Sequence, residues 1–299
     1  MNILVTGGNG FVGTYLVKKL SGMGNNIIVY SQFTRKNPFF EELVKNNSNI
    51  DCIQGDITNY KSISSACKNA DVIFHLAAAV GDDAQKTFLI NGMGTLNVLE
   101  AARQESIKRV IFASTAYVYG SPKYLPIDEK HPVSPNSYYG ISKLVGELYC
   151  KYYYKNYGVD IVILRFASIY GKGIENSYPM KAISIFLRAI LKDEAITIYG
   201  SGNQFRDYVY IDDVVDAFIN AMKRDVSGNV FNIAGGVKVT TMELARMMIK
   251  IADKDIKLNK KITKNNDTQD NYVFEITKAK RLLDFRPTPL IEGLKNVLL

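Results

Sequence analysis

The alternation of short apolar segments with amphipathic ones is the feature that most constrains how this chain can fold. Apolar runs typical of β-strands occupy residues 2–5, 26–30, 50–54, 71–75, 108–113 and 160–166. Between them, apolar residues recur at helical spacing over residues 11–20, 60–68, 88–104 and 137–157. Strands that are apolar throughout and separated by helices form a parallel sheet covered on both faces. The sequence therefore predicts an α/β protein with a doubly wound parallel sheet.

The rhythm changes after residue 170, which indicates a second, smaller unit. We expect a helix at residues 181–191, a short strand near residue 197, and a return to the main sheet at residues 209–210 and 230–233. Residues from about 236 onward predict short helices and a polar, Asn-rich loop near 263–271. We therefore predict a dinucleotide-binding (Rossmann) domain of residues 1–170 plus about 205–235, and a C-terminal substrate lobe of about 171–204 and 236–299.

Composition narrows the class of partner. The chain has 299 residues, of which 47% are apolar, and this favours a globular protein over a disordered one. The formal net charge of +8 comes from 37 basic and 29 acidic residues. The basic residues are dispersed, without a patch of interleaved aromatic residues, so the charge favours an anionic small molecule over nucleic acid.

Cysteine and histidine usage argues against secretion and against a metal centre. The three cysteines, Cys52, Cys67 and Cys150, form no C-x-x-C pair, which is typical of a reducing compartment. The N-terminus reads as a strand and not as a signal peptide, and the apolar stretch near residues 72–80 is too short to span a bilayer. His75 ends a strand, and His131 lies in a loop without an evident partner. We therefore predict no metal site, no membrane association and a cytoplasmic protein.

Three glycines between the first strand and the first helix predict a phosphate-binding loop. Gly7, Gly10 and Gly13 form a G-x-x-G-x-x-G pattern. Glycine permits a tight turn and a close approach of a pyrophosphate, and the helix N-terminus supplies unpaired N–H groups with positive partial charge. The alternative is a glycine-rich turn without a ligand, but the placement between strand and helix favours a dinucleotide site.

The end of the second strand bears on the choice between NAD and NADP. An acidic residue there would hold the ribose hydroxyls of NAD, whereas a nearby arginine can accommodate the 2′-phosphate of NADP. Ser31 occupies the expected acidic position and Arg35 follows four residues later. The sequence leaves NADP open beside NAD, and it also leaves open that Arg35 is a solvated loop charge.

A tyrosine and a lysine four residues apart predict acid–base chemistry. Tyr139 and Lys143 lie on one face of the predicted helix at 137–157. The pKa of tyrosine is ordinarily about 10, and the charge of a neighbouring lysine would lower it. Ser114 or Thr115, at the end of the fifth strand, can hold a substrate oxygen. The alternative is an aromatic residue on the helix surface beside a solvated lysine, which a chain with 19 tyrosines can present by chance.

The ordered set of motifs resembles the extended short-chain dehydrogenase/reductases of the nucleotide-sugar epimerase/dehydratase family. The resemblance covers nearly the whole chain. It is carried by the glycine loop at 6–13 and by the segments 55–57 (GDI), 75–78 (HLAA), 113–120 (ASTAYVYG), 139–143 (YGISK), 164–166 (LRF), 206–213 (RDYVYIDD) and 232–236 (NIAGG).

The resemblance implies roles for individual residues. The positions that match the family's cofactor site are Gly7, Gly10, Phe11, Val12, Gly13, Asp56, Ile57, Ala77, Ala78, Asn91, Tyr139 and Lys143. Of these, the glycine loop would hold the pyrophosphate, Asp56 and Ile57 the adenine, and Lys143 the nicotinamide ribose. Thr115, Tyr139 and Lys143 would be catalytic, with Tyr139 as the base. The positions expected to face the substrate are Ser114, Thr115, Tyr117, Ser168 and Arg206.

Departures from the family pattern reduce the number of activities that the resemblance allows. The 4,6-dehydratases carry Asp-Glu where this chain has Ala116 and Tyr117, so a 4,6-dehydratase is not expected. Ser168 stands where many epimerases have a phosphate-binding Asn, and Asn265 falls near the place of a second diphosphate-binding Arg. The resemblance also suggests a homodimer through the helices that carry residues such as Tyr152.

Three functions remain open on the sequence. The preferred one is an NAD(P)-dependent nucleotide-sugar epimerase, similar to UDP-glucose 4-epimerase, that acts at C4 through a 4-keto intermediate. The second is an NADPH-dependent reductase of a 4-keto-deoxysugar nucleotide. The third is a non-catalytic dinucleotide-binding protein with a regulatory or RNA-associated role, which the presence of both Tyr139 and Lys143 disfavours.

Overall fold

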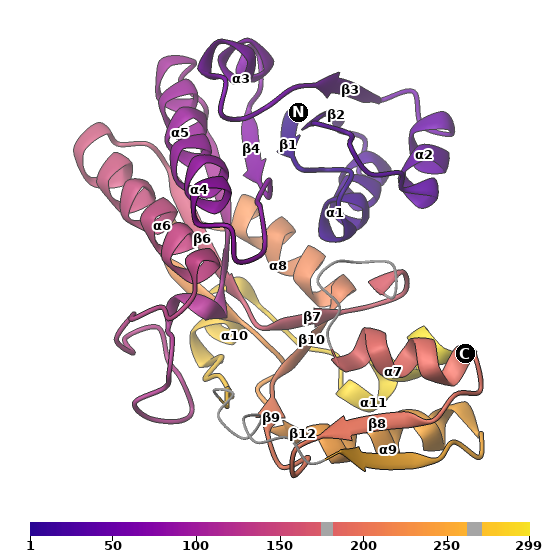
Figure 1. Cartoon of the computed structure of the whole chain (residues 1–299). Coiled ribbons are helices and arrows are strands. Elements are labelled where there is room, and N and C mark those ends of the chain that lie inside the picture. The colour runs from indigo at the N-terminus through magenta and orange to yellow at the C-terminus, as the bar shows by residue number, and fades with distance from the viewer. Residues whose placement is uncertain (175–181, 262–270) are drawn as a thin grey trace.

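The computed structural model describes residues 1–174, 182–261 and 271–299. Within this part of the chain, a seven-stranded sheet forms the centre of the molecule (Figure 1). In spatial order its strands are β11 (Val230–Ile233), β6 (Ile161–Phe166), β5 (Arg109–Thr115), β4 (Val72–His75), β1 (Asn2–Thr6), β2 (Asn26–Ser31) and β3 (Ile50–Gln54). Every neighbouring pair is parallel, so the predicted doubly wound sheet is confirmed.

The inner strands are largely apolar because both of their faces are covered, whereas the edge strand β3 is mostly exposed. Ile3 and Val5 of β1 belong to the hydrophobic cluster on one face, whereas Leu4 belongs to the cluster on the other. The same alternation holds in β5, where Ile111 faces the first cluster and Val110 the second. Successive side chains of a strand point to opposite faces, so a strand buried on both faces needs an unbroken apolar run.

Helices cover the sheet in two layers. One face carries α1 (Phe11–Gly22), α2 (Pro38–Lys45), α8 (Ile211–Lys223) and α10 (Thr277–Leu283). The other face carries α3 (Tyr60–Cys67), α5 (Gly94–Gln104) and α6 (Tyr138–Tyr157). In the described part of the chain, no helix is both long enough and apolar enough to cross a membrane.

A third hydrophobic cluster lies beyond the sheet. It is built by α7 (Ala182–Leu191), α9 (Thr241–Ala252) and α11 (Leu290–Leu298) with the parallel pair β8 (Ile196–Tyr199) and β13 (Leu258–Lys261). Figure 1 shows these elements together at the bottom of the molecule. We propose that they form the substrate lobe, and that residues 272–285 belong with the sheet, since Phe274 and Leu283 pack into its first cluster.

The predicted return of residues 209–210 to the main sheet is wrong. β10 (Tyr208–Tyr210) pairs with β7 (Ser168–Tyr170) in a separate two-stranded sheet. A second short pair joins β9 (Phe205–Arg206) to β12 (Val239–Thr240). The predicted return at residues 230–233 is confirmed by β11. Most of the predicted loop at 263–271 lies outside the described residues.

Two helical regions differ from the prediction. The single helix expected at 88–104 is divided into a π-helical turn (Phe88–Met93) and α5, and a short helix that was not predicted, α4 (Ala84–Thr87), precedes it. The helix α2 was not predicted, although Asn37 caps it by accepting a hydrogen bond from the Phe40 N–H, and Pro38 occupies its first turn. An Asn followed by Pro at this position is a helix-start signal that identifies α2.

Candidate active site

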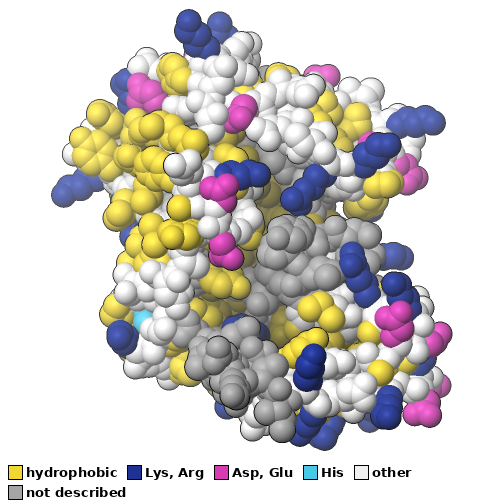
Figure 2. Space-filling model, in the orientation of Figure 1, with side chains coloured by type: hydrophobic (Ala, Val, Ile, Leu, Met, Phe, Trp, Pro, Cys, Tyr) yellow, Lys and Arg dark blue, Asp and Glu magenta, His cyan; other side chains and the backbone are white. Residues whose placement is uncertain are grey.

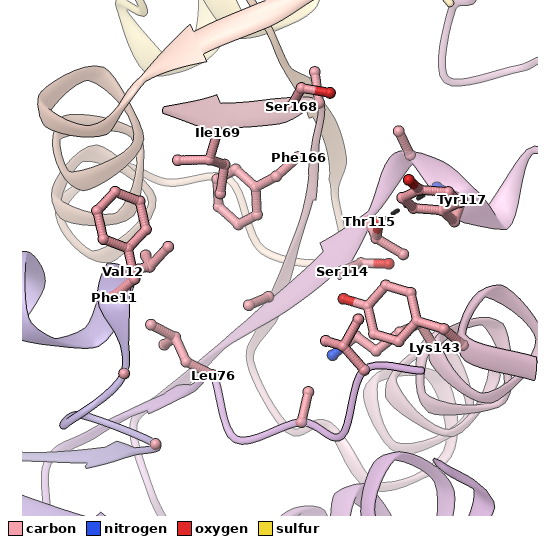
Figure 3. A pocket seen from close by; sticks show the side chains of 18 of the residues that line it. Phe11, Val12, Leu76, Ser114, Thr115, Tyr117, Lys143, Phe166, Ser168 and Ile169 are labelled. Carbon is pink, nitrogen blue, oxygen red and sulfur yellow. Dashed lines mark hydrogen bonds between the residues drawn. The ribbon is translucent and has the colours of Figure 1, made fainter. Parts of the chain in front are cut away.

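A cavity of about 520 Å³ opens at the carboxyl ends of the central strands. The strand order reverses between β1 and β4, and such a reversal leaves a crevice where doubly wound sheets bind ligands. Phe11 and Val12 of α1 line one side of this cavity, and Thr115, Tyr117 and Lys143 line the other (Figure 3). The cavity therefore brings the predicted cofactor loop and the predicted catalytic residues to one place.

The glycine loop has the geometry that a pyrophosphate needs. Gly7 adopts a φ of +71°, and a Cβ at Gly13 would lie only 2.5 Å from the Gly7 carbonyl oxygen. Gly10 stands at the N-cap of α1 without a side-chain acceptor for the first-turn N–H groups. These N–H groups are therefore available to an anionic ligand, and the residues present fit a dinucleotide.

The ribose end of this site is built by the loop after β2. Ser31 donates a hydrogen bond of 2.6 Å to Asn9 Oδ1, and the Asn37 amide donates one of 2.8 Å to the Asn9 carbonyl. The loop between these two anchors, which carries the exposed Arg35, is thus held against the glycine loop. Both anchors bind the residue that precedes Gly10.

The residues predicted to contact adenine already have partners. The Asp56 carboxylate accepts hydrogen bonds from the Thr58 N–H and hydroxyl at 2.8 Å, and from Gln32 at 2.7 Å. Ile57 is buried against Gly94 at the start of α5. Neither residue lines the cavity described above. A role in adenine binding therefore stays a prediction for both.

Asn91 holds the segment that follows β4 and does not itself line the cavity. Its side chain donates to the Ala79 carbonyl and accepts from the Ala79 N–H, both at 2.8 Å, and it donates to Ser142. Ala78 lines the cavity, whereas Ala77 is held by a hydrogen bond from its N–H to Thr6 Oγ1. These contacts hold the segment after β4, and Asn91 makes them from within the π-helical turn.

The two histidines are fully partnered. The His75 ring lies between the hydroxyls of Thr6 at 2.7 Å and Thr95 at 3.0 Å, and its burial lowers its pKa to about 3. The expectation that His131 lacks a partner is wrong, because His131 Nε2 accepts from the Lys123 N–H at 2.9 Å. Among the described residues, no three His, Cys, Asp or Glu side chains are grouped so that they could hold a metal ion.

Tyr139 and Lys143 lie one turn apart at the start of α6, where Ser137 caps the helix by accepting from the Gly140 N–H. Neighbouring atoms crowd the Tyr139 phenol, and this burial raises its pKa to about 12, while a hydrogen bond with Thr115 acts in the opposite direction. Burial lowers the pKa of Lys143 to about 8, and its Nζ lies 4.1 Å from the centre of the Phe112 ring. For the protein alone the pKa of Tyr139 is therefore raised and not lowered, and the group that acts against burial is Thr115 rather than the lysine.

A buried ion pair lies behind the residues predicted to be catalytic. Glu147, one turn after Lys143, accepts two hydrogen bonds from the Arg165 guanidinium, at 2.9 and 2.6 Å. Ser114 also donates to Glu147, at 2.6 Å. The hydroxyl proton of Ser114 is thus used in the hydrogen bond to Glu147, although Ser114 itself lines the cavity. A role of Ser114 as a substrate ligand stays a prediction.

Further groups that line the cavity are suited to a substrate. Tyr117, in the 3₁₀ turn Ala116–Val118 after β5, packs edge-on against Tyr139 with ring centres 6.0 Å apart. Arg206 lies over the Tyr272 ring, with 5.2 Å from guanidinium carbon to ring centre. Ser168 also lines the cavity (Figure 3). Asn265 lies outside the described residues.

Several residues at the cavity were not predicted from the sequence. Phe274 and Tyr272 line it, and so does Asp207, whose burial raises its pKa to about 7 while backbone N–H groups act in the opposite direction. A signal existed for Glu147, which continues the spacing of Tyr139 and Lys143 along one helix face. No local pattern identifies residues 272–274, because only the tertiary fold brings them to the site.

Comparison with known proteins gives consistent matches. The family model described as the NAD dependent epimerase/dehydratase family matches residues 3–234. A UDP-glucose 4-epimerase of Mycolicibacterium smegmatis is 32% identical over 251 residues, covering 82% of this chain and 80% of that protein. The crystal structure of UDP-glucose 4-epimerase from Thermotoga maritima with UDP-glucose matches with a TM-score of 0.92 and 31% identity, over 100% of this chain and 97% of that chain. The crystal structure of UDP-glucuronic acid 4-epimerase from Bacillus cereus with UDP-glucuronic acid and NAD matches with a TM-score of 0.88 and 32% identity, over 100% of this chain and 98% of that chain.

Proposed function

This chain belongs to the NAD-dependent epimerase/dehydratase family, and from that premise we propose that it is a nucleotide-sugar 4-epimerase that works with NAD. The observation that carries the proposal is the cavity itself. The glycine loop and the group Thr115, Tyr139 and Lys143 line one volume, so a dinucleotide and a sugar can meet there. The similarity to solved 4-epimerases along the whole chain supports the same reaction.

Each catalytic residue has a task that its position supports. Thr115 would hold the 4-oxygen of the sugar, and Tyr139 would take the proton of the 4-hydroxyl and later return it. NAD, when bound, would supply a nicotinamide ring that takes a hydride from C4 and returns it to the other face of C4 after the 4-keto sugar has turned over. For Tyr139 to act near neutral pH, positive charge beside its ring must lower a pKa of about 12. Lys143, with a pKa of about 8, is charged at pH 7, but the Tyr139 pKa of about 12 is reached with this lysine in place, so the further positive charge would come from the nicotinamide ring of bound NAD.

The two residues that follow β5 argue against an enzyme that eliminates water from the sugar. The residues that follow Thr115 are Ala116, which is buried, and Tyr117, whose ring packs on Tyr139. An aliphatic and a phenolic side chain cannot serve as the carboxyl pair that moves protons in the 4,6-dehydratases which the chain resembles. The proposal is therefore an epimerase and not a dehydratase.

The ribose end favours a second candidate, an NADPH-dependent reductase of a 4-keto-deoxysugar nucleotide. No carboxylate stands at the end of β2, and the Asp56 carboxylate nearby is taken up by Thr58 and Gln32. The loop over the glycine loop carries the exposed cation Arg35. This arrangement tolerates a 2′-phosphate, which an acidic residue at position 31 would repel.

One experiment separates these candidates. The purified protein is denatured and the released nucleotide identified, and the native protein is assayed on UDP-glucose, UDP-galactose and their N-acetyl forms. Retained NAD and interconversion without net use of cofactor are expected. Stoichiometric oxidation of NADPH would favour the reductase, and inactivity on every pair would reject the epimerase.

A matched pair of variants tests the role of Tyr139. Tyr139→Phe should lower kcat by about 100-fold or more, because general acid–base groups contribute factors of about 10²–10⁴. Tyr138→Phe is the control, since Tyr138 is the neighbouring residue and its side chain is 51% exposed. Tight dinucleotide binding without turnover, unchanged by Tyr139→Phe, would favour a non-catalytic protein instead.

We also propose a homodimer through an apolar face on α6 and the π-helical turn beside it. The exposed apolar side chains there are Phe88, Leu89, Met93, Tyr138, Ile141, Leu148 and Tyr152. Those of α6 recur at intervals of three, seven and four residues, so they share one face of the helix. Figure 2 shows hydrophobic side chains gathered over this side of the molecule, where Figure 1 places α4, α5 and α6. Contiguous apolar patches of this kind mark protein–protein contacts, and a two-fold axis would bury the patch against its own copy.

A further inference from the structure

We propose that Asp207 is a positioning residue for the substrate, which holds three segments of the chain together and thereby places Arg206 and Tyr272 in the cavity wall. The inference rests on the proposed function, because it assumes that this wall receives a nucleotide sugar. Asp207 lies between β9 and β10, outside the seven-stranded sheet, and is 1% exposed. Its carboxylate therefore acts through what it binds inside the protein.

The Asp207 carboxylate accepts hydrogen bonds from two other segments of the chain. Its Oδ1 accepts from the Gly235 N–H at 2.8 Å and from the Gly236 N–H at 3.1 Å. Its Oδ2 accepts from the Gly236 N–H and from the Phe274 N–H, both at 3.1 Å. One side chain thus ties the turn after β11 and the segment at 272–274 to the strand that carries Arg206.

The tied segments carry the groups that face the cavity. Arg206, Asp207, Tyr272 and Phe274 all line it. The Arg206 guanidinium lies over the Tyr272 ring, and the Tyr272 hydroxyl donates to the Gly120 carbonyl at 2.9 Å. A guanidinium held over an aromatic ring has a fixed orientation. The direction in which Arg206 presents its charge therefore depends on the position of residues 272–274, and Asp207 sets that position.

Only an ionised carboxylate satisfies this arrangement. Both oxygens of Asp207 face main-chain N–H donors, and a carboxylate accepts on both. An asparagine at the same place offers one acceptor oxygen, and its amide group would face N–H donors on the other side. Asp207→Asn therefore releases either the Gly235 turn or the Phe274 segment, although it preserves size and shape.

The experiment measures nucleotide binding by calorimetry, without need of turnover. UDP, dTDP and GDP are titrated into the wild-type protein, and the tightest binder is used for the variants. Asp207→Asn should weaken its Kd by about 10- to 100-fold, as expected for the loss of a hydrogen bond to a charged group. The rise in melting temperature caused by NAD should stay unchanged, since the glycine loop is not among the tied segments. Where turnover is measurable, KM should rise by the same factor and kcat by less than about threefold either way.

Two further variants keep the test decisive. Asp225→Asn is the control, because Asp225 is exposed and precedes β11 at the opposite end of the sheet. If Asp207→Asn does not fold, Gly235→Ala is measured instead, since a Cβ there would press on the Tyr208 carbonyl and lie 3.2 Å from Asp207 Oδ1. It should weaken nucleotide binding in the same way.

Several results would overturn the inference. An unchanged nucleotide Kd in the variants would do so, and a parallel loss of NAD binding would show a general structural role. Failure of both Asp207→Asn and Gly235→Ala to fold would also show a general structural role and would overturn the inference. Binding of none of the three nucleotides by the wild-type protein would reject this inference and the proposed function together. If the wild-type protein binds a nucleotide but converts no sugar, the epimerase proposal alone is rejected. The role of Asp207 is then still tested by the nucleotide Kd of the variants, and weaker binding by Asp207→Asn would support that role.

Discussion

Replacement of Glu147 by glutamine tests how the buried ion pair supports the active site. The side chains of Glu147 and Arg165 are 0% and 3% exposed, so neither charge is compensated by water. In Glu147→Gln one amide oxygen can still accept a hydrogen bond, but the amide nitrogen would face a guanidinium N–H. Among the described residues, Arg165 Nη1 already has no hydrogen-bond partner, so the variant would leave most of this cation unpaired.

The size of the effect follows from the bonds that are lost. Arg165 makes two charge-assisted hydrogen bonds to Glu147, and each such bond contributes about 1.5–3 kcal/mol. Breaking a buried pair from one side costs about 3–5 kcal/mol in other proteins. The glutamine oxygen can keep one of the two hydrogen bonds, so the expected loss lies at the lower end of this range. We therefore expect Glu147→Gln to lower the free energy of unfolding by about 3 kcal/mol.

The assay is urea unfolding of cofactor-free protein followed by circular dichroism. Asp216→Asn is the control, because Asp216 pairs with Lys19 at 3.6 Å on the surface and such pairs contribute less than about 1 kcal/mol. The double variant Glu147→Leu/Arg165→Met should recover at least half of the loss, since no charge stays buried. A loss below about 1 kcal/mol in Glu147→Gln, or a double variant as unstable as the sum of its single variants, would refute this reasoning.

Three other predictions concern charge, cofactor and assembly. Burial lowers the pKa of Lys143 from 10.5 to about 8, so the folded chain binds fewer protons than the unfolded one between these values and its stability rises with pH there. A shift of one pKa unit corresponds to about 1.4 kcal/mol, so Lys143→Met should be more stable than the wild-type protein by about 3 kcal/mol at pH 7.5. This difference should fade by about pH 10.5, and a difference in urea midpoints that is the same at both pH values would contradict the prediction. Arg35→Asp should weaken NADPH binding by about 10-fold or more without weakening NADH binding, as measured by fluorescence titration against the control Lys45→Asp. Leu148→Glu should give monomers by light scattering, whereas Leu191→Glu, on the exposed side of α7, should not; a Leu148→Glu dimer would reject the proposed interface.

The sheet could be predicted from the sequence because burial on both faces leaves a largely apolar run in each of its inner strands. Strand pairing could not be predicted equally well. Residues 208–210 are as apolar as a strand of the main sheet, yet they pair with β7, and no local pattern specifies a partner. The division of the helix at 88–104 also escaped prediction, because the Asn91 contacts that accompany its π-helical turn are tertiary.

The sequence correctly brings the glycine loop, Thr115, Tyr139 and Lys143 to one cavity, but it indicates neither all of the lining residues nor the electrostatics. The spacing of Tyr139 and Lys143 correctly indicates that they share a helix face at the cavity. It says nothing about how deeply the phenol is buried, and burial raises the pKa that the lysine was expected to lower. For Ser114 the strand-end position was informative, but the partner of its hydroxyl, Glu147, comes from another element.

The two buried carboxylates explain how the cavity can present positive charge to a diphosphate. Glu147 stands one turn from Lys143 and Asp207 stands next to Arg206, yet both are turned into the protein, where Arg165 and main-chain N–H groups neutralise them. Each carboxylate therefore positions the segment that carries a cation without repelling an anionic substrate. Asp207→Asn removes a negative charge beside Arg206, and this change of charge alone would strengthen the binding of an anionic nucleotide. Weaker binding by Asp207→Asn at both low and high salt would therefore show that Asp207 acts by position, whereas tighter binding, most marked at low salt, would show that it acts by its charge. Arg206→Gln should weaken binding and flatten its salt dependence.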